Sequence, residues 1–291
     1  MTPWCRQGGA GAGGGFADRL TRLLPMTEGD RVAQPHDVGV ETIGSVAVVT
    51  LRRPPHNLLT EPALRRLADA VHSLSGSARA AVLCSEGRSF CAGADFRSSE
   101  APDPTVGGSF EARTGAFYRQ ATRIFASPVP LVAAVHGAAI GAGFGLALAC
   151  DLRVVGTRGW FQANFVRLGI HPGFALSVTL PDCVGPTRAA ELLLTGRRVG
   201  AEEASRLGLA NQVVNEGNER DAALALAEEI ASGAPRAVLS TRATLRAGLA
   251  DRAGRAMEHE LAEQAALAGT ADAAEGVAAM LEGRPPRFSG D

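Results

Sequence analysis

The first clear pattern of hydrophobic and polar positions lies between Val38 and Leu51, where two β-branched runs flank Gly44 and Ser45. Such an arrangement is typical of a β-hairpin. A helix is predicted after Thr60, whose hydroxyl can cap its first turn. The apolar positions that follow are three and four residues apart and therefore share one helical face: Leu64, Leu67, Val71 and Leu74.

Short apolar runs further along the chain predict two buried strands, Ala80–Cys84 and Pro130–Val135. An amphipathic stretch lies between them, over residues 117–125. A helix is expected after Gly145, and a further strand is expected to begin at Asp151. Strands that alternate with helices in this way are typical of an α/β core with right-handed crossovers.

Beyond Pro186 the pattern becomes mainly helical, with one expected strand, Leu209–Val214. The remaining segments keep the apolar period of a helix. These helical segments are Arg188–Leu194, Ala201–Leu207, Ala222–Ile230, Arg236–Leu249 and Arg255–Leu281. We expect this C-terminal region to act in assembly or as a lid.

The first 30 residues are rich in glycine between Gly8 and Gly15 and lack the apolar run that a secretory signal needs. We predict that residues 1–30 form a disordered tail. An organellar presequence is disfavoured by Asp18 and by these glycines. No membrane span is expected, because the most apolar window, Ile140–Ala149, is too short and contains three glycines.

Composition narrows the class of protein. With 291 residues, of which 46% are hydrophobic and 20% charged, the chain has enough apolar material for one large or two small globular domains. Its 29 basic residues nearly balance 30 acidic ones without a block of like charge, so we expect no nucleic-acid partner. Every basic residue is arginine, which excludes a Schiff-base lysine and a phosphate-loop lysine.

The cysteines show neither a CxxC motif nor a Cys/His pair at the spacing of metal ligands. There are five of them, Cys5, Cys84, Cys91, Cys150 and Cys183. The pattern therefore predicts no metal site and no disulfide framework. Reduced thiols and a cytoplasmic location are expected.

Two segments of small residues are candidate ligand-binding turns. In Ser85–Asp95 the chain leaves a strand and turns around Gly93, and in His136–Gly145 it leaves another strand and opens a helix. Small side chains let backbone N–H groups approach a ligand closely, so each turn can direct a donor at an oxyanion. The alternative is an ordinary tight turn between a strand and a helix. The glycines of the second segment do not follow the GxGxxG spacing of a dinucleotide-binding loop.

Five blocks, present together and in order, resemble the crotonase superfamily, also called the enoyl-CoA hydratase/isomerase family. The blocks are Arg53–Asn57, Arg88–Asp95, Ala134–Gly137, Ala149–Asp151 and Leu168–Gly173. The resemblance runs from about Val38 to the C-terminus. It implies an α/β fold with a spiral core of ββα repeats over residues 31–215 and a helical trimerisation region over residues 216–291. Homotrimers, often paired into hexamers, are the implied assembly.

The shared chemistry of that family is an acyl-CoA thioester whose carbonyl is held by two backbone N–H groups. Carried over to this chain, the resemblance implies that these donors are Ala94 and Ala142. No separate cofactor is implied, because coenzyme A belongs to the substrate. The positions implied to contact coenzyme A or the acyl group are Arg53, Pro55, His56, Ala92, Asp95, Asn164 and Phe165. Asp95 is expected to be structural or to lie near the adenine rather than to be catalytic.

The chain departs from the family pattern at the acid/base positions. Hydratases of the family use two glutamates, and here Gly145 and Phe165 stand at those positions, while Gly173 stands where some isomerases carry their base. The standard hydration mechanism therefore lacks its proton carriers. His171 is our first choice for a replacement, because histidine titrates near neutral pH and this one lies close to the base positions.

Other replacements are weaker on sequence grounds. Asn164 can orient a water molecule but cannot take a proton. Glu111 and Tyr118 lie on the helix that borders the acyl pocket in relatives. The aromatic residues of the later segment, Phe161, Phe165 and Phe174, favour an apolar or aromatic acyl group.

Three functions compete at this point. The leading hypothesis is an enzyme that acts on an acyl-CoA thioester and stabilises its enolate. A crotonase-like protein that binds acyl-CoA without turning it over is the alternative. The third hypothesis is a dinucleotide-binding oxidoreductase, which a titration with coenzyme A and with NADH would separate from the other two.

Overall fold

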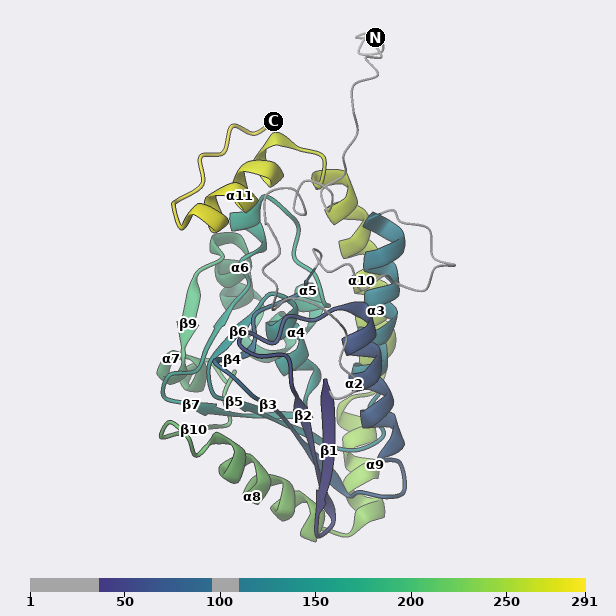
Figure 1. The fold of residues 1–291 in the computed structure, drawn as a ribbon. Helices are drawn as coiled ribbons and strands as arrows, with labels where there is room; N and C mark the ends of the chain where they lie inside the picture. Colours follow the sequence, from purple (N-terminus) through teal and green to yellow (C-terminus); the bar gives the residue numbers. More distant parts are fainter. Residues whose placement is uncertain (1–36, 96–109) are drawn as a thin grey trace.

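The computed structural model describes residues 37–95 and 110–291 (Figure 1). The expected disordered tail, residues 1–30, lies outside the described residues. None of the described helices is long and apolar enough to cross a membrane.

Most predicted strands form one six-stranded sheet, whose order is β1-β2-β3-β5-β7-β10. The hairpin predicted around Gly44 and Ser45 is confirmed, since β1 and β2 pair antiparallel, and the other neighbours are parallel. The bounds are β1 (Val38–Ile43), β2 (Val46–Leu51), β3 (Ala80–Ser85), β5 (Leu131–Val135), β7 (Leu152–Gly156) and β10 (Gln212–Val214).

A second, four-stranded sheet was not predicted, because strands of three residues are too short to show a period-two pattern. Its members in order are β4 (Ser89–Cys91), β6 (Ala138–Ile140), β8 (Trp160–Gln162) and β9 (Arg198–Gly200). β4, β6 and β8 are parallel, and β9 is antiparallel to β8. Each strand of this sheet up to β8 directly follows a strand of the large sheet, so the chain winds between the two sheets as a spiral.

The described helices are α2 (Glu61–Ser73), α3 (Phe110–Phe125), α4 (Ala142–Ala149), α5 (Leu176–Val184), α6 (Pro186–Thr195), α7 (Ala201–Arg206), α8 (Glu219–Ser232), α9 (Pro235–Leu245), α10 (Leu249–Leu267) and α11 (Ala271–Glu282), with a 3-10 turn, η2 (Phe165–Leu168). The single helix expected over 255–281 is wrong. The first helix, α10, ends at Leu267. A new helix, α11, then begins at Ala271, and the Thr270 hydroxyl caps it by accepting the Ala273 N–H at 3.1 Å. α4 begins at Ala142, earlier than expected, and α5 was not predicted.

Apolar residues cover both faces of the large sheet. On one face, α2 and α3 contribute to a core that also includes α10 and α4. The predicted cap of α2 is confirmed, because Thr60 Oγ1 accepts the Ala63 N–H at 3.3 Å. On the other face lies α8, with Ala223, Ala227 and Ala231 against the strands (Figure 1). The apolar core therefore continues past residue 215.

Candidate active site

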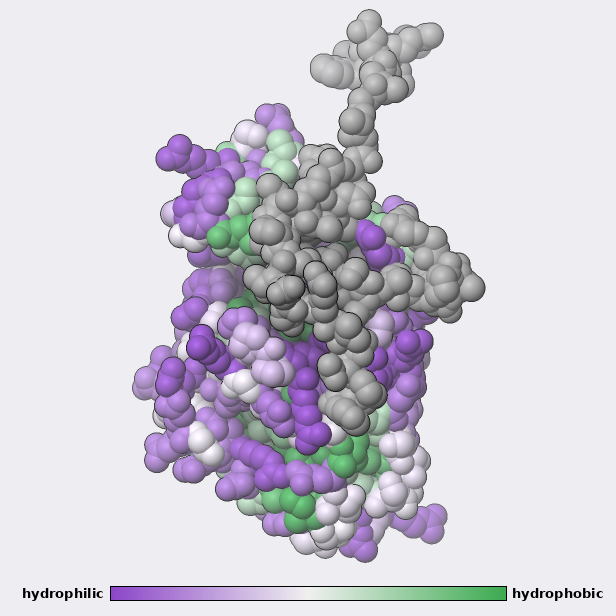
Figure 2. Space-filling model, viewed as in Figure 1, coloured by the Kyte–Doolittle hydropathy of each residue, from purple (hydrophilic) through white to green (hydrophobic). Residues whose placement is uncertain are grey.

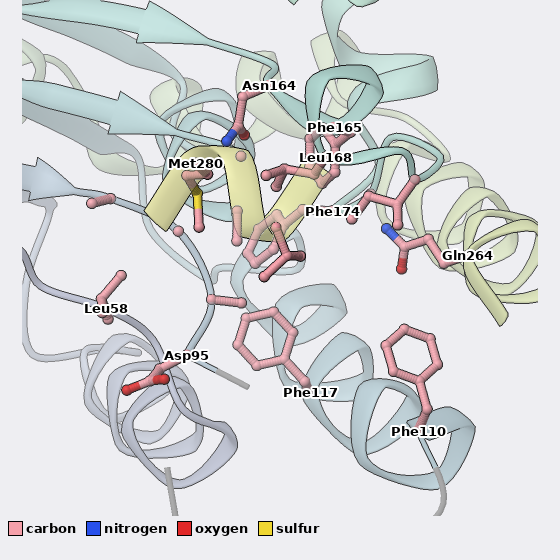
Figure 3. A pocket seen from close by; sticks show the side chains of 18 of the residues that line it. Leu58, Asp95, Phe110, Phe117, Asn164, Phe165, Leu168, Phe174, Gln264 and Met280 are labelled. Atoms are coloured by element: carbon pink, nitrogen blue, oxygen red, sulfur yellow. The ribbon is translucent and has the colours of Figure 1, made fainter. Parts of the chain in front are cut away.

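Three turns meet at one edge of the small sheet. β4, β6 and β8 are parallel neighbours, so their carboxyl ends lie together. The segments that follow these strands bring Ala94, Ala142 and Asn164 to the wall of a single cavity of about 260 Å³. Asn164 is labelled on this wall in Figure 3. The order of the strands in the small sheet thus brings together three turns that are far apart in the sequence.

The first turn leaves one backbone donor without an acceptor. Gly93, at φ 116°, reverses the chain after β4. Ala92 N donates to His56 O at 2.9 Å, and Asp95 N donates to Leu59 O at 2.7 Å. Among the described residues, the Ala94 N–H between them has no hydrogen-bond acceptor.

The second turn provides a donor of the same kind. Gly141, at φ 54°, donates its N–H to Gln162 O at 2.9 Å, and α4 starts at the next residue. The N–H groups of a first helical turn have no intrahelical partner. Accordingly, the Ala142 N–H has no acceptor within the part of the chain that the structure describes.

Close packing brings α4 against the first turn. A Cβ atom at Gly143 would collide with the carbonyl oxygen of Cys91 and come within 2.8 Å of Cys91 Cβ. Only glycine allows this approach of two backbones. A side chain at Gly141 would lie 3.4 Å from Asn164 Oδ1, so the Asn164 amide sits beside the second donor.

The rest of the cavity wall is largely apolar and comes from four elements. Figure 3 shows Phe110 and Phe117 of α3 facing Phe165 and Leu168 of η2, with Phe174 between them and Met280 of α11 to one side. Val277 and Leu281 of α11 also line it. Of the three aromatic residues that favoured an apolar acyl group, Phe165 and Phe174 line the cavity, whereas Phe161 is fully buried against Phe144, with ring centroids 5.1 Å apart.

Aromatic side chains fill the space beside two glycines. A Cβ atom at Gly145 would lie 2.5 Å from Cδ1 of Phe174. At Gly173 it would collide with the Tyr118 hydroxyl and lie 2.6 Å from Gln264 Nε2. Neither position has room for a longer side chain while these neighbours stay in place.

Tyr118 is the buried tyrosine among the residues that line the cavity. Its hydroxyl donates to Gln264 Oε1 at 3.0 Å, and Gln264 Nε2 donates to the His171 carbonyl at 2.9 Å. Burial raises the pKa of Tyr118, and the negative charge of Glu260 raises it further. The phenol therefore keeps its proton at neutral pH.

The structure does not bring His171 to the cavity wall. Its Nδ1 lies 2.8 Å from the carbonyl of Pro172, and its ring meets that of His259 edge-on at 5.9 Å. Glu111 is exposed on α3 and does not line the cavity either. Of the three candidates for proton transfer outside the small-residue turns, Tyr118 alone reaches the wall.

The residues expected at coenzyme A are divided between the cavity and the surface. Ala92 and Asp95 line the cavity. Pro55 and His56 do not line it and are exposed at the surface. His56 Nδ1 lies 3.3 Å from Ser89 Oγ. The Arg53 guanidinium holds its own turn together, because Nε donates to Leu58 O at 2.9 Å and an Nη pairs with Asp37 at 2.5 Å.

Sequence reasoning missed the contributions of the last two helices. Gln264 of α10 and the α11 side chains carry no local signal that links them to a turn more than a hundred residues away. Apolar spacing in a helix predicts a buried face but does not indicate which partner covers it.

Comparisons with known proteins show the family to which the chain belongs. Residues 41–291 match the model of the family described as enoyl-CoA hydratase/isomerase. The chain belongs to this family, and it is an enzyme of the family by its similarity to the relatives below. Its mixed α/β architecture, with two sheets and C-terminal helices, is the crotonase fold.

Three relatives illustrate the match. A protein named "Probable enoyl-CoA hydratase" from Rhodobacter capsulatus is 35% identical over 257 residues, which cover 88% of this chain and 98% of the relative. The human "Enoyl-CoA hydratase domain-containing protein 2, mitochondrial" is 38% identical, over 69% of each chain. The crystal structure of an enoyl-CoA hydratase/isomerase from Pseudoalteromonas atlantica superimposes with a TM-score of 0.76 at 30% identity, covering 87% of this chain and all of that one.

Proposed function

We propose that the protein binds an acyl-CoA thioester with its carbonyl oxygen between the N–H groups of Ala94 and Ala142 and stabilises the enolate of that thioester. The observation that carries the proposal is the pair of backbone donors without acceptors at one apolar cavity. Fixed donors of this kind stabilise developing negative charge on oxygen by roughly 3 kcal/mol each. Alanine serves at both positions because only the N–H is used.

Tyr118 is the proton-transfer group in this account, in place of His171. Tyr118 lines the cavity and its hydroxyl remains protonated, which suits donation of a proton to the α-carbon of an enolate. The proposed step requires rotation about the C–O bond to turn the proton from Gln264 toward the substrate. In that step the Tyr118 O–H bond breaks and a C–H bond forms, and the phenolate is left for reprotonation from solvent.

The cavity also supports an apolar acyl group. Its walls are built mainly from phenyl rings and aliphatic side chains, and two of its polar lining residues, Asp95 and Asn164, lie next to the two donors. A ligand with a polar thioester end and an apolar acyl end matches that division. The coenzyme A portion would pass over the exposed turn of Pro55 and His56.

The direct test is removal of each donor. Ala142→Pro deletes one N–H at the first residue of a helix, where proline is well tolerated. Ala94→Pro deletes the other. Either variant should lose at least ~100-fold in thioester binding or turnover.

A matched control is available in α7. Ala201 also follows a glycine as the first residue of its helix and does not line the cavity. Ala201→Pro should therefore bind acyl-CoA as the unaltered protein does. Unchanged binding by both Ala94→Pro and Ala142→Pro would refute the assignment of the donors.

A further inference from the structure

The loop before α5 holds two non-glycine residues in the left-handed region. Phe174 has φ 59° and Ala175 has φ 57°. Residues other than glycine, asparagine and aspartate rarely adopt this conformation, and it persists only when the surroundings enforce it. The position and support of the Phe174 ring therefore require an explanation.

The ring of Phe174 forms a wall of the cavity next to the second donor. It packs edge-on to Phe117, with centroids 5.9 Å apart, and is only 1% exposed. The same ring fills the space above Gly145, three residues along α4 from Ala142. Ala142 and Phe174 both line the cavity, so an acyl group bound through Ala142 would extend along this ring.

A buried carboxylate from another helix fixes the loop. Glu260 of α10 is fully buried and accepts the N–H groups of Ala175 at 2.8 Å and Ser177 at 3.1 Å. Ser177 Oγ donates to the same carboxylate at 2.6 Å. Ala175 is the N-cap of α5 and has no side-chain oxygen, so Glu260 supplies the cap that the helix itself lacks.

We propose that Phe174, held in place by Glu260, determines the length of acyl group that the cavity accepts. Phe174 is the specificity-determining residue, and Glu260 is a positioning residue that acts through it. The inference rests on the proposed function, because it assumes that a thioester is bound at Ala94 and Ala142.

The test measures affinity for a series of straight-chain saturated acyl-CoA thioesters by titration calorimetry with the full-length protein. For the unaltered protein, affinity should fall sharply once the acyl group exceeds a certain length, by about tenfold or more for each further methylene. Phe174→Ala removes the wall, so the fall in affinity should begin at an acyl group about two methylenes longer. An unchanged length profile in Phe174→Ala would overturn the inference.

The contact with Gly145 is tested by a double-mutant cycle. Gly145→Ala places a methyl group 2.5 Å from the ring and should weaken binding of every thioester by about tenfold. In the Phe174→Ala background the same substitution should have little effect, because the ring is gone. Equal losses in both backgrounds would show that the ring does not lie against Gly145.

Glu260 is tested against a neighbour on the same helix. Glu260→Gln keeps the size of the side chain but loses part of its capacity to accept, so the fall with chain length should become more gradual. Glu263→Gln, at an exposed position of α10, should leave the profile unchanged. Ser177→Ala removes only the bond from the hydroxyl and provides a milder variant if Glu260→Gln does not fold.

The outcomes separate this inference from the proposed function. If no thioester binds the unaltered protein, the proposed function fails. If thioesters bind but neither Glu260→Gln nor Ser177→Ala alters the length profile, Glu260 serves stability alone and the positioning role is refuted. If they bind and Phe174→Ala keeps the profile, the specificity role fails while the proposed function stands.

Discussion

Aromatic side chains beside single glycines decide which chemistry the cavity can perform. Phe174 occupies the space next to Gly145, and the Tyr118 hydroxyl occupies the space next to Gly173. A carboxylate at either glycine would require these side chains to move. In the proposed function, the site therefore combines two backbone donors with a phenol, rather than with a pair of acids.

Hydration of crotonyl-CoA should consequently be slow or absent. Hydration needs one group to activate water and another to protonate the α-carbon, and each contributes typically 10²- to 10⁴-fold. Gly145 and Phe165 can supply neither. The loss of enoyl absorbance with time measures the rate, and rapid decay would show that another group performs the general base step.

The role of Tyr118 predicts a distinctive pH profile. Tyr118→Phe deletes only the hydroxyl and should slow turnover of a reactive acyl-CoA by about 10²-fold or more, whereas His171→Ala should turn over at nearly the original rate. Because burial raises the pKa of Tyr118, the donor stays protonated through neutral pH. The rate should therefore stay level there and fall only in the alkaline range, as the phenol ionises.

A different pH profile would contradict the role of Tyr118. A rate that rises with pH through the neutral range, and that is lost in a folded His171→Ala variant, would make His171 the proton-transfer group. His171 would then have to turn toward the cavity when the substrate binds.

At the scale of helices and strands, local signals predicted most of the large sheet. Strands β1, β2, β3, β5 and β7 are five or six residues long, and β2, β3 and β5 are almost wholly apolar. The cap of α2 is a single residue, Thr60. The small sheet positions the site but could not be predicted, because strands of three residues are too short to show alternation of apolar and polar positions. The two donors were located through the resemblance of their turns to a family, since no periodicity marks an unpaired N–H.

The contact between α4 and the first turn gives a prediction at this scale. Gly143→Ala adds a methyl group that collides with the Cys91 backbone, which should cost about 2 kcal/mol even after the gain in helix propensity. Gly200→Ala is the control, because a Cβ atom there meets nothing within 4 Å. Urea denaturation compares the two, and equal stability of both variants would contradict the close packing.

At the scale of the whole molecule, several large apolar side chains are exposed on the single chain, and a subunit contact would cover them. α9 has no buried residue, and its Leu245 is 81% exposed, while Leu194 of α6 is 77% exposed. Apolar surface also appears beside α11 in Figure 2, where Met280 is half exposed. Leu249, Leu261 and Leu267 of α10 are partly covered within the chain.

We expect the protein to form trimers or pairs of trimers that cover this surface. Light scattering at micromolar concentration should return a mass three or six times that of the 30.0 kDa chain. A monomer under those conditions would contradict the prediction. Replacement of Leu245 by glutamate should shift the assembly toward smaller species, because the charge would be buried at a subunit contact.

The central claim, that two backbone donors hold a thioester carbonyl, is tested most directly by a crystal structure with a saturated acyl-CoA bound. The account predicts that the thioester oxygen lies about 2.7–3.1 Å from both Ala94 N and Ala142 N, with the acyl group along Phe174. A carbonyl oxygen bound away from these two nitrogens would contradict it.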